Sequence, residues 1–141
     1  MNEMVLTSII AILIVIGGIL TWNFVPQRRR AKRFKNRPEL DFDQIYKDFF
    51  AHKGLQRELV YELWNEIAQS LDVPLGKIRP SDRFDQELAA PKGWEYDDNL
   101  VEVQWAAERR LKRVGVQVDL SQIKTISDYV ELFCRLQGQA K

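Results

Sequence analysis

Three carboxylates stand close together in the second half of the chain. Asp97 and Asp98 are adjacent, and Glu102 follows about one helical turn later. Carboxylates grouped in this way can act as an acid–base pair or hold a metal ion. They also crowd the beginning of a predicted helix, where negative charge interacts favourably with the helix dipole. We favour this second explanation and predict a charge bias rather than a catalytic or metal site.

The other reactive residue types occur singly. His52 is the only histidine and Cys134 the only cysteine. We expect the histidine at the surface, and the cysteine, beside Phe133 in an amphipathic helix, to be buried and inert. One cysteine excludes an intrachain disulfide, and without a Cys/His cluster a zinc site is excluded. No glycine-rich phosphate loop is present. We therefore predict that the protein is not an enzyme and uses no metal or cofactor.

Aromatic residues flank the carboxylates. Trp94 and Tyr96 either line a partner site or pack as part of a loop, and the sequence leaves both explanations open. Trp105 lies further along the same predicted helix, and we expect it in the core. A protein partner is predicted to contact the region where the loop meets the helix. The predicted partner-binding residues are Trp94, Tyr96, Asp97, Asp98, Asn99 and Glu102.

Helices must position these residues. Apolar side chains recur at helical spacing in 41–53, 55–71 and 97–114. A last helix is predicted from a capping box at Thr125 and Asp128 to about Leu136. Gly54 and Gly115 are predicted to end two of the earlier helices, and Asp119 to cap a short turn over 120–123. The long connection 72–96 carries spaced apolar anchors that are predicted to pin it over a core: Ile78, Phe84, Leu88 and Trp94.

This pattern resembles acyl carrier proteins and the wider carrier-domain family over about residues 57–137. The matching pieces, in order, are Leu71-Asp72-Val73, Ile78-Arg79-Pro80, Phe84, Gln86-Glu87-Leu88, Asp98-Asn99-Leu100, Gly115-Val116 and Lys124-Thr125-Ile126-Ser127-Asp128. The resemblance implies an all-α fold: a small helical bundle with a long loop between its first two main helices. It also implies that Asn99 stands where carrier proteins attach 4′-phosphopantetheine to a serine.

Because an amide cannot replace the serine hydroxyl in that attachment, two functions remain open. The first is a non-catalytic, carrier-like protein that acts as a protein-binding or scaffolding module. The alternative is an acyl or peptidyl carrier that is modified at a serine or other hydroxyl outside the usual motif. The hydroxyls nearest in sequence are Ser81 and Tyr96.

The N-terminal stretch Met4–Val25 has no ionisable side chain. As a helix rising about 1.5 Å per residue, it is long enough to cross a hydrocarbon core of about 30 Å. A basic cluster follows, which by the positive-inside rule predicts a single-pass bacterial inner-membrane protein with a cytoplasmic C-terminal domain. The cluster is a topology determinant or a lipid contact, and its residues are Arg28, Arg29, Arg30, Lys32, Arg33, Lys35 and Arg37.

The predicted organisation has four parts. They are a transmembrane anchor (1–27), a basic juxtamembrane linker (28–40), a short connecting helix (41–54) that packs on the domain or lies along the membrane, and a carrier-like helical domain (55–141). The formal net charge of +1 conceals a basic linker joined to a mildly acidic domain. We predict a lipid bilayer and a protein as partners. Nucleic acid is not expected, because the basic cluster lacks a folded platform.

Overall fold

The computed structural model describes residues 10, 12–15, 32–89 and 100–139. These residues form helices, and they include no β-strand beyond an isolated bridge between Arg83 and Thr125. The described part of the chain is therefore all-helical, as predicted. In chain order its named helices are α2 (Phe42–Phe49), η1 (Ala51–Lys53), α3 (Arg57–Ser70), η2 (Leu75–Lys77), α4 (Leu100–Val114), η4 (Leu120–Gln122) and α5 (Ile126–Gln139).

The structure corrects the prediction of a membrane anchor. Met4–Val25 falls largely outside the described residues, and within them no helix is both long and apolar enough to cross a membrane. The helical residues described in that stretch are 10 and 12–15. The predictions of a single-pass anchor and an inner-membrane location are wrong on this finding.

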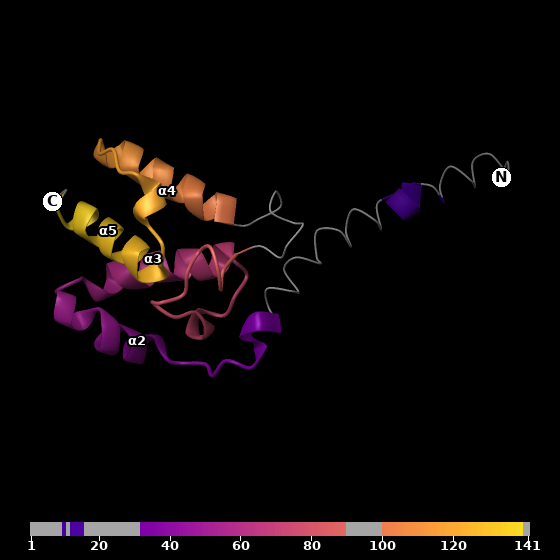
Figure 1. Ribbon diagram of the computed structural model, residues 1–141, viewed down its shortest axis with the longest axis horizontal. Helices are drawn as coiled ribbons and strands as arrows, with labels where there is room; N and C mark the ends of the chain where they lie inside the picture. The colour runs from indigo at the N-terminus through magenta and orange to yellow at the C-terminus, as the bar shows by residue number, and fades with distance from the viewer. Residues whose placement is uncertain (1–9, 11, 16–31, 90–99, 140–141) are drawn as a thin grey trace.

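Helix α3 is the centre of the bundle. Figure 1 shows α4 and α5 on one side of α3 and α2 on the other, and α3 contacts all three. Val60, Leu63, Trp64 and Ile67 recur at helical spacing along α3 and are all fully buried. The indole Nε1 of Trp64 donates to the carbonyl of Leu75, 3.1 Å away, so its one polar group is satisfied inside the core.

The core extends upstream of residue 55, where the carrier-like domain was predicted to begin. Phe42 and Ile45 on the buried face of α2 belong to the same apolar cluster as α3, and so does Phe50. Phe34, in a helical turn at 32–35, is only 1% exposed. The segment before residue 55 is thus an integral part of the folded bundle.

Local signals set several helix ends as predicted. Thr125 and Asp128 form a reciprocal capping box: the Asp128 amide donates to Thr125 Oγ1 at 3.1 Å, and the Thr125 amide donates to Asp128 Oδ2 at 2.9 Å. Gly54 and Gly115 follow η1 and α4 with φ of 69° and 71°, a conformation that other residues rarely adopt. Helix α5 runs past its predicted end, to Gln139.

Candidate functional site

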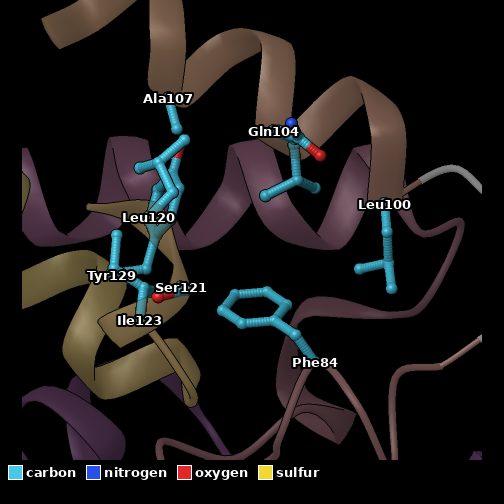
Figure 2. Close-up of a pocket in the computed structure, with 9 residues that line it drawn as sticks. Phe84, Leu100, Gln104, Ala107, Leu120, Ser121, Ile123 and Tyr129 are labelled. Atoms are coloured by element: carbon cyan, nitrogen blue, oxygen red, sulfur yellow. The ribbon is translucent and has the colours of Figure 1, made fainter. Parts of the chain in front are cut away.

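An apolar pocket of about 380 Å³ lies under the first half of α4. Figure 2 shows the ring of Phe84, from the connection after α3, directed into the space below α4. Three parts of the chain form the walls: that connection, α4, and the segment from η4 into α5. The lining residues are Phe84, Leu100, Val103, Gln104, Ala107, Leu120, Ser121, Ile123 and Tyr129.

The pocket communicates with solvent. Val103, Ala107 and Tyr129 are buried, whereas Gln104 and Ser121 are exposed. The apolar floor therefore carries two hydrogen-bonding side chains where it meets water. This is the usual composition of a binding site, in which apolar walls supply affinity and a few polar groups supply orientation.

Helical spacing explains the α4 wall. Val103 and Ala107 are one turn apart and continue the buried stripe that ends at Leu111. The opposite wall comes from η4, which begins where Asp119 Oδ1 accepts a hydrogen bond of 3.0 Å from the Ser121 amide. This cap turns Leu120 and Ser121 toward the space below α4.

A polar cluster fixes the second half of α4. Arg110 forms an ion pair with Glu66 of α3, and its Nη2 lies 3.5 Å from Glu62 Oε1. The hydroxyl of Tyr129 donates to Glu66 Oε1 at 3.0 Å. Three helices are thus joined by one guanidinium, one phenol and two carboxylates, beside the pocket that the Tyr129 ring helps to line.

Burial decides the ionisation of this cluster. It raises the pKa of the Tyr129 phenol, and the Glu66 carboxylate raises it further, so the phenol stays protonated and donates. Burial opposes the charge on Arg110, but Glu66 outweighs it and raises the guanidinium pKa.

Burial also raises the pKa of the Cys134 thiol to about 11. A thiol in that state is a poor nucleophile, in line with the inert cysteine expected.

Most of the predicted partner-binding residues lie outside the described part of the chain. They are Trp94, Tyr96, Asp97, Asp98 and Asn99. Glu102 is described: it is exposed on the first turn of α4 and lines a separate groove with Glu62 and Glu66 of α3, not the apolar pocket.

Trp105 was expected in the core and is instead 55% exposed. It follows Val103 by two residues, which is about 200° around a helix, so the two side chains point in nearly opposite directions. Its ring lines the groove above α3 with Glu102 and Arg109. His52 is exposed, as expected.

The structure describes only part of the basic cluster. Arg28, Arg29 and Arg30 lie outside the described residues. Lys32, Arg33, Lys35 and Arg37 are described, and two of them make internal contacts. Arg33 Nη1 donates to the carbonyl of Ala89 at 2.9 Å, and Arg37 Nη1 donates to Asp82 Oδ2 at 2.6 Å.

Sequence reasoning predicted none of the residues that line the pocket as binding residues, and it named Phe84 only as an apolar anchor of the long connection. The short turn over 120–123 was predicted, but nothing in its own sequence indicates that it faces α4. Within the described residues, no group of three or more His, Cys, Asp or Glu side chains is arranged to hold a metal ion.

Comparison of the chain with protein-family models, with curated proteins and with solved structures gave no match. The apolar pocket and its surroundings are therefore the basis for a functional proposal.

Proposed function

We propose that this chain is a non-catalytic, carrier-like module that binds a partner protein by taking an apolar side chain of that partner into the apolar pocket. The observation that carries the proposal is the pocket of about 380 Å³ under α4, at the lower end of the volumes typical of ligand sites. Apolar anchors that fill such pockets account for most of the binding energy of protein interfaces.

The polar side chains at the opening favour a peptide over a purely apolar ligand. Gln104 has an amide that can pair with a backbone N–H or C=O, and Ser121 has a hydroxyl that can do the same. Gln104 Nε2 already donates to Glu108 Oε1 at 2.9 Å, which holds the side chain along α4 and leaves its carbonyl oxygen as an acceptor. An apolar side chain inside, with its backbone at the opening, satisfies both parts of the site.

Adjacent alanines on α4 provide a matched test. Ala107 lines the pocket, whereas Ala106 lines the groove beside Trp105. In the full chain, Ala107→Leu should fill the pocket and weaken binding of the neutral fluorophore N-phenyl-1-naphthylamine, and of peptides selected against the wild type by phage display, by roughly tenfold or more. Ala106→Leu should leave both affinities unchanged.

Folding is checked separately by thermal unfolding, where both variants should remain close to the wild type because each adds volume beside empty space. Selected peptides that bind the Ala107→Leu variant as well as the wild type would overturn the proposal. Binding of the fluorophore without selection of any peptide would make this a small-molecule site instead.

A second function rests on Ser121. Its hydroxyl lines the apolar pocket, so an acyl carrier modified outside the usual motif has a candidate attachment oxygen there. Intact-mass measurement after coexpression with a phosphopantetheinyl transferase separates the two functions. We expect no added mass. A phosphopantetheine adduct on the wild type that disappears in Ser121→Ala would establish the carrier.

A further inference from the structure

Residues 32–40, called the strap here, cross the surface of the connection that supplies Phe84 to the pocket. Phe34 is buried at one end of the strap, and the guanidinium of Arg37 lies over its ring, 4.8 Å from the centroid. At the other end, the Leu40 amide donates to the carbonyl of Gly76 at 2.9 Å. The strap is therefore held at both ends.

The strap is also tied to residues 79–89, called the pocket loop here. The Arg79 guanidinium donates to the carbonyl of Pro38, and Arg33 donates to the carbonyl of Ala89. Arg37 Nη1 reaches Asp82 Oδ2 at 2.6 Å and the carbonyl of Lys77 at 3.0 Å. The two Arg37 contacts are half-buried, whereas those of Arg79 and Arg33 are exposed. Hydrogen bonds from charged donors are among the stronger ones in proteins, so Arg37 is the main tie between the strap and the pocket loop.

Asp82 joins the strap to the rest of the site. It is 3% exposed, the one charged residue that is buried in the described part of the chain. Its Oδ2 accepts from Arg37 and, at 2.7 Å, from the Arg79 amide, while its carbonyl accepts from the Ile126 amide of α5 at 3.1 Å. A buried carboxylate is costly unless it is paired, so loss of Arg37 leaves this position unstable.

Phe84 lies two residues beyond Asp82. Its amide donates to the carbonyl of Lys124 at 3.0 Å, and its ring packs edge-on against Tyr129 with centroids 6.3 Å apart. The pocket loop is thus held by the strap on one side and by the start of α5 on the other. The position of the Phe84 ring depends on both.

We propose that the strap regulates the apolar pocket, with Arg37 and Asp82 as positioning residues that hold Phe84 in its wall. This inference rests on the proposed function for its binding consequence, but the coupling between strap and loop stands on its own contacts. When the strap is bound to the pocket loop, the pocket stays formed, and displacement of the strap from the loop loosens the pocket.

Two substitutions in the strap that each remove one positive charge test the coupling in the full chain. Arg37→Gln removes the contact to Asp82, whereas Lys35→Gln removes one positive charge from an exposed side chain of the same strap. Arg37→Gln should speed hydrogen exchange at the Phe84 amide by roughly tenfold, because a hydrogen bond to a charged group stabilises by at least that factor. Binding of N-phenyl-1-naphthylamine should weaken in parallel. Lys35→Gln should change neither, and Arg37→Lys should restore part of both.

A second pair acts without changing charge. A Cβ on Gly76 would lie 2.4 Å from the Leu40 carbonyl oxygen, so Gly76→Ala must displace the strap. Gly138, with open space around it, provides the control substitution Gly138→Ala. Gly76→Ala should reproduce the exchange and binding changes of Arg37→Gln, while amides of α3 such as Leu63 keep their wild-type exchange.

The outcomes separate the two proposals. Unchanged Phe84 exchange in both Arg37→Gln and Gly76→Ala would overturn the coupling. Faster exchange with unchanged fluorophore affinity would overturn regulation of the pocket. Uniformly faster exchange, including Leu63, would mean that the strap only stabilises the whole fold, and would also overturn it. A wild type that binds neither fluorophore nor peptide would defeat the proposed function, while the exchange measurements would still decide the coupling.

Discussion

The two halves of α4 are attached to the bundle in different ways. The second half is fixed by Arg110, Glu66 and Tyr129 through an ion pair and a hydrogen bond, with Leu111 buried beside them. The first half lies over an apolar pocket whose opposite wall belongs to η4 and the pocket loop. One helix is thus both an anchored element and the roof of a site.

This difference shows how a small bundle can leave room for a ligand without losing its structure. Directional charged contacts hold a helix in place over a short length, so the rest of it need not be fully packed. Tyr129 belongs to both regions, since its hydroxyl contacts Glu66 and its ring lines the pocket. Substitutions in the two regions should therefore separate stability from binding.

The largest effect is expected from Arg110→Ala. It leaves the Glu66 carboxylate partly buried without its cation, and breaking such a pair destabilises by about 2–3 kcal/mol when some solvent exposure remains. Urea unfolding measures the change. As a control in the pocket half, Gln104→Ala should alter stability by less than about 0.5 kcal/mol. Equal losses in both variants would remove the distinction between the two halves.

Tyr129→Phe should lower stability less than Arg110→Ala does, and it should separate the role of the Tyr129 hydroxyl from that of its ring. The ring remains, but the hydrogen bond to Glu66 is lost, which should lower stability by about 1–2 kcal/mol. Fluorophore binding should stay at the wild-type level. A weakened affinity with unchanged stability would show that the hydroxyl serves the pocket rather than the anchor.

A still smaller effect concerns pH. Burial tends to raise the Glu131 pKa, but Lys53 and Ser127 donate to this carboxylate and lower it overall. A depressed pKa contributes stability that is present above the unfolded value of about 4.3 and is lost as pH falls through the lower folded value. Glu131→Gln should therefore flatten the acid limb of the stability profile by up to about 1 kcal/mol.

The same acid titration should leave the pocket unaffected. Apart from Tyr129, whose raised pKa keeps it protonated, no residue that lines the pocket titrates. Fluorophore affinity measured between pH 5 and 8, where the chain remains folded, should be constant. An affinity that follows the Glu131 titration would contradict the separation of the two regions.

The smallest expected effect is an absence of reaction at Cys134. The thiol is buried on the anchored side and its pKa is raised to about 11, so iodoacetamide at neutral pH should not modify the folded chain. Modification should appear in urea. In Arg110→Ala it should appear at lower urea concentrations, which would report directly on loosening of the anchored half.

The sequence by itself determined the features that depend on neighbours within a few residues. Helical periodicity indicated α3, α4 and α5, and the Thr125–Asp128 spacing indicated the capping box that the structure contains. Gly54 and Gly115 marked helix ends because a left-handed conformation there is favourable mainly for glycine. Each of these signals acts across one turn of chain.

Only the tertiary structure decided the pocket and the strap. The pocket walls come from segments far apart in sequence, and the strap reaches Asp82 from Arg37, 45 residues away. No local pattern specifies such contacts, because they depend on how the helices pack against α3. Periodicity placed the apolar stripe of α4 on the face opposite Trp105, but packing determined how closely that stripe is covered, and it left the space below α4 open.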